Sequence, residues 1–281
     1  SRGYTRLQNK QYEEAIEDFD KFIFQENKVA DAYIGRGTAY LYLKDTVRAL
    51  ENFDQAIRTN RENPNGYYQR GTLLLQKEEY ARAEADFDMS IRCDSTFLPP
   101  YFNRAVVYSN TNRPMQALAD FDRVLQLDST NSFTYFNRAI LRTQIGDYNR
   151  ALDDFDRVAL YSPGNVQVYY LRAMLKTRLG DLEGAERDYT RAIELYPDFA
   201  NAYLNRSALR YALHNPKAAK RDEEIAQRKI AEYKSHLKDS TYSIYADTTQ
   251  RMDKLLAFDN QFTNSYFDRI SEQPSLGRSN M

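Results

Sequence analysis

One spacing dominates this sequence. When the chain is slid against itself by 34 residues, one arginine column falls into register. The column consists of Arg2, Arg36, Arg70, Arg104, Arg138, Arg172 and Arg206. A fixed period of this length indicates one supersecondary unit repeated along the chain, and each unit buries its apolar face by stacking on the next.

Three further columns share the period. A small residue follows each arginine, an alanine comes later in the repeat, and an aromatic residue comes four positions after the alanine. The small residues are Gly3, Gly37, Gly71, Ala105, Ala139, Ala173 and Ser207; the alanines are Ala15, Ala49, Ala83, Ala117, Ala151, Ala185 and Ala219; the aromatics are Phe19, Phe53, Phe87, Phe121, Phe155 and Tyr189. Small residues let two helices approach closely, and an aromatic ring one turn away fills the space beside the contact.

Turn residues separate the helical stretches. Gly146 and Gly180 lie where a first helix should end, since glycine accepts the conformation that ends a helix. Pro64, Pro163 and Pro197 lie between repeats and stop the preceding helix. Each repeat is therefore predicted to be helix, turn, helix and stop.

These columns resemble the tetratricopeptide repeat family, in about seven units over roughly residues 1–233. The resemblance implies an all-α fold, a right-handed α-solenoid of helical hairpins, with units starting near 30, 64, 98, 132, 166 and 200. Two columns depart from the family. Tyrosine replaces the frequent early tryptophan at Tyr33, Tyr67, Tyr101, Tyr135, Tyr169 and Tyr203, and the arginine stands where leucine is usual.

An arginine near a helix contact needs a partner. The residue before each aromatic, and before Glu223 in the last repeat, is acidic in all but one repeat: Asp18, Asn52, Asp86, Asp120, Asp154, Asp188 and Asp222. We expect ion pairs within a hairpin or to its neighbour: Arg70 with Asp86, Arg104 with Asp120, Arg138 with Asp154, and Arg172 with Asp188. The alternative is a row of arginines that binds an acidic ligand.

Four repeats carry an Asp-Phe-Asp triplet, at 18–20, 86–88, 120–122 and 154–156. Their two carboxylates project about 200° apart on a helix and cannot share a metal ion. One is expected to meet the arginine and the other to face water.

Composition excludes several functions. The formal net charge is −1 with both signs interleaved, which argues against nucleic-acid binding. No stretch has the roughly 18 to 20 continuous apolar residues of a membrane span. Cys93 is alone, only His214 and His236 are available, and no phosphate-binding loop or nucleophile elbow occurs. We therefore expect no enzyme activity, metal or cofactor; the compartment, cytoplasmic or exported, stays open.

The two ends differ from the middle. The chain opens inside a first helix, so we expect an incomplete first unit, and after Pro216 a long charged helix is expected to cap the array. Glu223 takes the aromatic position there. Residues 234–281 are expected to form a helical extension, with a helix near 247–257, and a loose tail.

We therefore expect the function to depend on binding at the protein surface. The first helices of such a solenoid line its concave face, and we predict a peptide-binding groove there made by Tyr68, Gln69, Phe102, Asn103, Phe136, Asn137, Tyr170 and Asn205. The arrangement is similar to the asparagine ladder of the O-linked N-acetylglucosamine transferases, which implies that Asn103, Asn137 and Asn205 hold peptide backbone. Gly35, Gln69 and Leu171 interrupt the ladder. The alternative is that the aromatics pack on neighbouring helices or on the C-terminal segment.

Two hypotheses follow. In the first, the array binds an extended peptide or a helix of a partner protein in its groove. In the second, it is a structural scaffold, a self-associating region or a spacer within a larger protein, with a homo-oligomer as its expected form.

Overall fold

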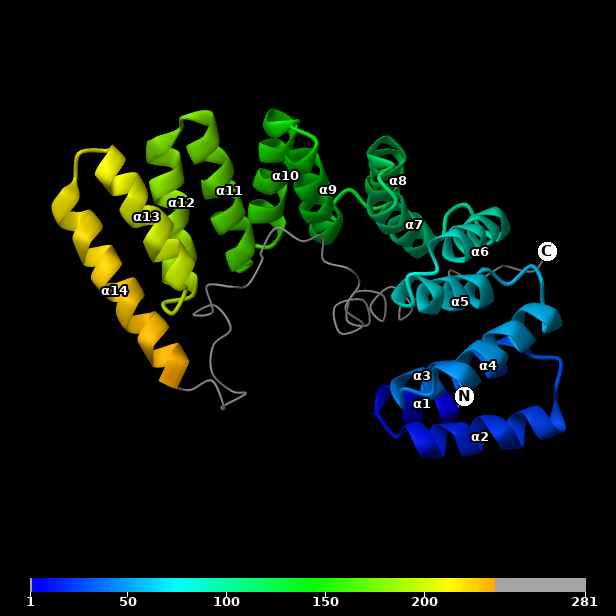
Figure 1. Ribbon diagram of the computed structural model, residues 1–281. Helices are drawn as coiled ribbons and strands as arrows, with labels where there is room; N and C mark the ends of the chain where they lie inside the picture. The colour runs from blue at the N-terminus through cyan, green and yellow to red at the C-terminus, as the bar shows by residue number, and fades with distance from the viewer. Residues whose placement is uncertain (1, 236–281) are drawn as a thin grey trace, which may run out of the picture. The chain divides into compact units, whose positions relative to one another are not determined.

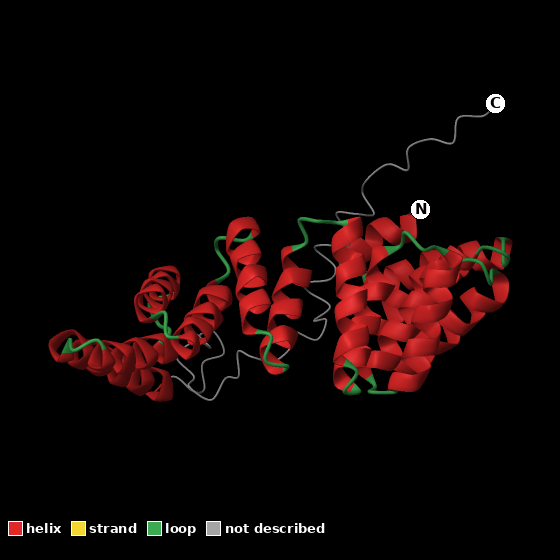
Figure 2. Cartoon of the chain, turned by 90° about the horizontal axis from the view of Figure 1, so that it is seen from above, coloured by secondary structure: helices red, strands yellow, loops and turns green. Residues whose placement is uncertain are grey.

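The structure is a computed structural model that describes residues 2–235. It divides the chain into two compact units with a boundary after Ser129. Each unit is built of helical hairpins joined by short loops, and no strand occurs within residues 2–235 (Figure 2). The expected helix near 247–257 and the tail lie outside the described residues.

Unit 1 contains four hairpins. Its helices are α1 (Arg2–Gln8), α2 (Tyr12–Gln25), α3 (Ala30–Tyr42), α4 (Thr46–Thr59), α5 (Pro64–Gln76), α6 (Tyr80–Cys93), α7 (Leu98–Asn110) and α8 (Pro114–Leu127). Unit 2 contains three hairpins. Its helices are α9 (Ser132–Gln144), α10 (Tyr148–Tyr161), α11 (Val166–Leu179), α12 (Leu182–Leu195), α13 (Ala200–Ala212) and α14 (Pro216–Ser235).

The odd-numbered helices are the first helices of the hairpins and the even-numbered ones the second helices (Figure 1). Each first helix packs on the second helix that follows it, and within a unit each second helix also packs on the next first helix. Within each unit the chain is thus an all-α solenoid. From the second hairpin onward the first helices begin at Ala30, Pro64, Leu98, Ser132, Val166 and Ala200, the positions expected for the units.

Local signals explain the helix starts. Asp45, Asn63 and Asn165 each accept a hydrogen bond from a backbone N–H of the first turn of α4, α5 and α11. Such side-chain caps satisfy amide groups that have no partner inside the helix. Proline occupies a first-turn position in α5, α7 and α8, where its missing N–H costs nothing.

The turn inside every hairpin has one residue with a positive φ, again at a spacing of 34 residues. These residues are Lys10, Lys44, Glu78, Asn112, Gly146, Gly180 and His214. Only two are glycine, so the glycine signal reveals two turns of the seven. The others hold an L-residue in the left-handed region, which is unfavourable for a side chain with a Cβ.

The cores follow the repeat columns. The alanine column and the aromatic column are buried; Ala83, Phe87, Ala117 and Phe121, for example, are fully inaccessible. The small residues after the arginines lie against these rings. A Cβ added to Gly71 would lie 2.9 Å from the Phe87 ring, closer than van der Waals contact allows.

Candidate functional site

The arginine column forms two-pronged ion pairs inside the hairpins. In the fourth hairpin, Nε and Nη2 of Arg104 donate to Oδ2 and Oδ1 of Asp120 at 2.8 and 2.7 Å. The same geometry joins Arg70 to Asp86, Arg138 to Asp154, Arg172 to Asp188, and Arg206 to Asp222. The four pairs expected from the sequence are all present. Such parallel bonds fix the orientation of both side chains.

The third guanidinium nitrogen reaches the preceding hairpin. Nη1 of Arg104 donates to Oδ1 of Asp88 at 2.6 Å, and Arg70 and Arg172 bind Asp54 and Asp156 in the same way. This corrects the expectation that the second carboxylate of the Asp-Phe-Asp triplet faces water. Stacking brings the next first helix alongside that carboxylate, so each of these arginines ties its own second helix to the preceding one.

The tyrosine column completes this arrangement. The Arg172 guanidinium lies 5.4 Å from the centre of the Tyr169 ring, a distance typical of a cation–π contact. The Tyr169 hydroxyl donates to the backbone oxygen of Pro163 at 3.1 Å in the loop before the helix. Tyr101 does the same with Arg104 and Ser95. A tyrosine therefore supplies both a ring for the arginine and a hydroxyl for the loop, which tryptophan does not.

Burial sets the protonation behaviour of these carboxylates. Desolvation raises the pKa of Asp120 and of Asp154, although Arg104 and Arg138 act in the opposite direction. Hydrogen bonding to Asp86 raises the pKa of Arg70 above its ordinary value. The arginines described here donate to the chain's own carboxylates, so the pairs are structural and do not form an open row for an acidic ligand.

The predicted groove aromatics are buried, not exposed. Phe102 and Phe136 are each 1% exposed, and their rings meet Phe121 and Phe155 of their own second helices edge to face. Tyr68 and Tyr170 are also buried, against Phe87 and Tyr189. This corrects the expectation of an aromatic groove surface. The aromatic residue of the first helix completes the aromatic layer of its own hairpin.

The predicted asparagine ladder is also turned inward. Nδ2 of Asn103 donates to Thr72 at 3.0 Å, Nδ2 of Asn137 to the Phe133 backbone oxygen at 2.8 Å, and Nδ2 of Asn205 to the Tyr170 hydroxyl at 3.0 Å. Asn103 and Asn137 are fully buried, whereas Asn205 and Gln69 are partly exposed.

The ladder contains two amide oxygens without a hydrogen-bond partner in the described chain, and its interruption at Gly35 has a packing cause. The side-chain oxygens of Asn103 and Asn137 have no hydrogen-bond partner within the described chain. At Gly35, where the ladder lacks an asparagine, an added Cβ would overlap the Phe19 ring. Glycine is therefore required there by packing.

A different set of first-helix residues is exposed in unit 2. It comprises Met174, Thr177 and Arg178 on α11 and Ala208, Tyr211 and Ala212 on α13, and we call it the α11–α13 face. Each residue of α13 is 34 positions after its counterpart on α11. Met174 and Tyr211 are 43% and 47% exposed. The hydrogen bond from Asn205 to Tyr170 joins the two helices beneath this face.

No residue type marks this face in the sequence, because its six residues share no chemistry. The available signal is the helical spacing: 174, 177 and 178 are three and four residues apart and so lie on one side of α11.

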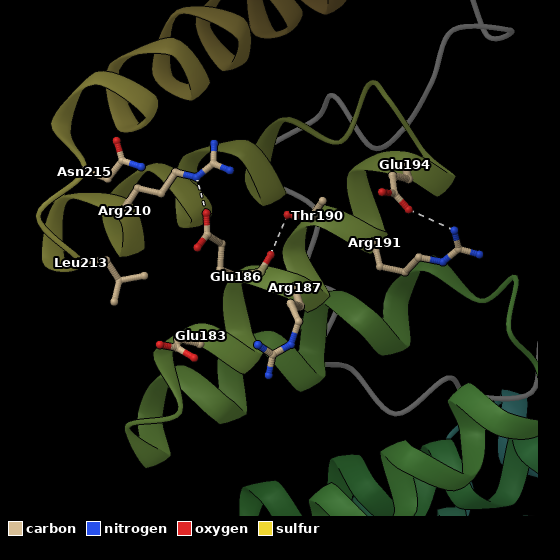
Figure 3. Close-up of a pocket in the computed structure, with 9 residues that line it drawn as sticks. All are labelled: Glu183, Glu186, Arg187, Thr190, Arg191, Glu194, Arg210, Leu213 and Asn215. Atoms are coloured by element: carbon tan, nitrogen blue, oxygen red, sulfur yellow. Dashed lines mark hydrogen bonds and ion pairs between the residues drawn. The ribbon is translucent and has the colours of Figure 1, made fainter.

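A cavity of about 710 Å³ lies between α12, α13 and the turn before α14 (Figure 3). It is lined by Glu183, Glu186, Arg187, Thr190, Arg191, Glu194, Arg210, Leu213 and Asn215. Arg210 pairs with Glu186 at 2.6 Å and Arg191 with Glu194 at 3.1 Å. In each of these two pairs a glutamate neutralises the arginine. The lining includes no histidine or cysteine.

Within residues 2–235 no group of three or more His, Cys, Asp or Glu side chains could hold a metal ion. None of the fourteen described helices is both long and apolar enough to span a membrane.

Comparison with known proteins identifies the repeats. Residues 34–96 and 166–199 match two family models, each described as tetratricopeptide repeat. No curated protein matches the sequence. Neither family model describes an enzyme.

Solved structures share the fold. YrrB, described as a tetratricopeptide protein with an unusual peptide-binding site, is 23% identical, with a TM-score of 0.57 over 66% of this chain and 96% of its own. The C-terminal part of a repeat protein from Cytophaga hutchinsonii is 17% identical, with a TM-score of 0.64 over 89% of this chain and 99% of its own. PilF of Pseudomonas aeruginosa is 20% identical, with a TM-score of 0.63 over 69% and 89%.

The repeat matches, the helical hairpins and these structural likenesses agree, and the fold implies protein partners. The chain is a tetratricopeptide repeat protein, and its fold is that of a protein-interaction module.

Proposed function

We propose that this protein binds an extended segment or a helix of a partner protein along the exposed side of its first helices. The observation that carries the proposal is the α11–α13 face, where Met174 and Tyr211 are both more than two-fifths exposed. Methionine and tyrosine are enriched in protein interfaces, because they supply large contact areas. The ion pairs and the aromatic layer hold the other sides of these helices, so this side is the one left for a ligand.

The groove residues expected from the sequence have a supporting role in this proposal. Tyr170 and Asn205 lie beneath the α11–α13 face and are joined by a hydrogen bond, so they set the spacing of α11 and α13. Phe102, Asn103, Phe136 and Asn137 are buried and position their own hairpins. A ligand contacts the exposed residues that these side chains support.

Unit 1 adds an exposed row of amides. Gln8, Gln76 and Asn110 occupy equivalent positions at the ends of α1, α5 and α7, and all three are exposed; Tyr42 takes this position on α3 and interrupts the row. Neighbouring first helices of this unit pack on one another, α1 on α3, α3 on α5, and α5 on α7. An amide both donates and accepts, so such a row suits the backbone of an extended segment.

The test compares two pairs of substitutions at exposed sites. Met174→Ala with Tyr211→Ala removes the apolar contacts of the α11–α13 face. Met115→Ala with Leu160→Ala is the matched control on second helices, where these side chains are 71% and 66% exposed. Circular dichroism first establishes that all forms are equally helical.

Each form is then used to capture proteins from a lysate of its source. The proposal expects a partner that the wild type and the control retain and the Met174/Tyr211 form loses. Identical partners for all three forms would contradict it.

A further inference from the structure

In unit 2 the first helices and the second helices differ in the signs of their charged residues. The whole chain is nearly neutral, with 39 Lys and Arg against 40 Asp and Glu. The first helices α9, α11 and α13, however, contain no Asp or Glu. Their charged residues are Arg138, Arg142, Arg172, Lys176, Arg178, Arg206 and Arg210. Positive and negative residues are interleaved along the sequence, but the charged residues of the first helices of unit 2 are all positive.

Six of these cations share three buried carboxylates. Arg138 and Arg142 contact Asp154; Arg172 and Lys176 contact Asp188; Arg206 and Arg210 contact Asp222. The carboxylates belong to the second helices and are 2 to 7% exposed. Each hairpin therefore holds two cations around one buried anion, and Arg172 and Arg210 also pair with the more exposed Asp156 and Glu186.

Arg178 is the exception. It is exposed, it lies one turn after Met174, and its guanidinium lies 4.5 Å from the centre of the Tyr148 ring on α10. The nearest acid in the sequence is Asp181, whose carboxylate accepts the backbone N–H of Gly184 as the cap of α12. An exposed guanidinium with no ion-pair partner among residues 2–235 thus lies one turn from the exposed Met174 side chain.

We infer that the α11–α13 face selects partner segments that combine apolar side chains with acidic residues. The inference rests on the proposed function and adds the chemistry of the partner. A partner carboxylate pairs with Arg178, while apolar groups of the same segment cover Met174 and Tyr211. A basic segment meets the like charge of Arg178 and is repelled.

The exposure of Arg178 to water sets the expected size of the preference for acidic over basic segments. Opposite charges in contact at a water-exposed site favour association by about fivefold, and salt weakens the attraction, because the screening length is about 10 Å at 0.1 M ionic strength. We therefore expect at least about a fivefold preference for acidic over basic segments at low salt, and a smaller one at high salt.

The experiment uses a displayed library of short random peptides as its probe. The full chain is panned against the library in three forms: the wild type, Arg178→Glu, and Arg187→Glu. Arg187 is the control, because it is an exposed arginine of the second helix α12 with no ion pair in the described chain. Selected sequences are compared with the input library for net charge and apolar content.

The inference expects acidic, apolar peptides to be enriched by the wild type and by Arg187→Glu, and a shift toward basic peptides with Arg178→Glu. Enrichment of neutral or basic peptides by the wild type would overturn it while leaving the proposed function standing, provided that the Met174/Tyr211 form loses them. A panning without enrichment in any form would count against both.

Discussion

Replacing Arg104 by methionine tests the arginine arrangement most sharply. Arg104 holds two carboxylates that differ in burial: the Asp120 side chain is 8% exposed and that of Asp88 is 40% exposed. Removing one partner of a buried pair leaves an uncompensated charge, which costs about 3 to 5 kcal/mol. An exposed pair contributes at most about 1 kcal/mol.

We therefore expect Arg104→Met to lower the free energy of unfolding by about 3 kcal/mol or more and Asp88→Asn to lower it by less than about 1 kcal/mol. Urea denaturation followed by circular dichroism measures both, and hydrogen exchange locates the loss in α7 and α8. Combining Arg104→Met with Asp120→Leu should recover much of the loss, because the stranded charge is removed.

Equal effects of Arg104→Met and Asp88→Asn would refute the reasoning. So would a loss below about 1 kcal/mol for Arg104→Met, since the burial of Asp120 would then carry no cost.

Three further predictions concern single positions. Glu78→Gly should raise the free energy of unfolding by about 0.5 to 1 kcal/mol, since Glu78 has a φ of 59° and glycine relieves that strain; thermal melting that shows destabilisation would contradict it. Asn52→Asp should stabilise by about 0.5 to 1 kcal/mol, because Arg36 makes a single 2.7 Å bond to the Asn52 amide where other hairpins have a two-pronged pair; a lower urea midpoint would count against this. Burial raises the pKa of Asp154, so the folded chain binds this proton at a higher pH than the unfolded chain, whose ordinary pKa is 3.8. The Asp154 contribution to stability is then full below 3.8 and is lost as pH rises through the raised pKa; carbon NMR titration of Asp154 with a midpoint at or below 3.8 would disprove it.

Much of the fold could be predicted from the sequence because every repeat has similar residue types at the same positions. A helix start that is ambiguous at Leu98 alone is settled by its equivalents at Pro64 and Val166. The small and aromatic columns likewise identify the helix contacts, since only a close approach such as that of Gly71 to Phe87 explains their spacing.

The rotation of each first helix could not be read in the same way. A period of 34 residues aligns positions between repeats but does not say which side of a helix faces its neighbours. Phe102 and Asn103 were expected on the surface, yet α7 packs on both α8 and α6, and these contacts bury that side. The exposed side carries Met174 and Tyr211, whose counterparts Ala208 and Thr177 have different chemistry, so no column marks it.

The hairpin turns show the same limit. The left-handed residue is recognisable at Gly146, where glycine signals it, but Lys44 and Glu78 occupy the equivalent position without a local signal. The second carboxylate of the Asp-Phe-Asp triplet was also misjudged, because its partner Arg104 lies in the following repeat from Asp88.

The central claim is that a partner segment binds on the exposed side of the first helices. It is tested most directly by methyl NMR of the methionines, using a peptide selected by panning. Met174 lies on the α11–α13 face and is 43% exposed, whereas Met115 lies on the second helix α8 and is 71% exposed. The account predicts that the peptide shifts the Met174 methyl resonance and leaves that of Met115 in place. A peptide that shifts Met115 and not Met174 would contradict it.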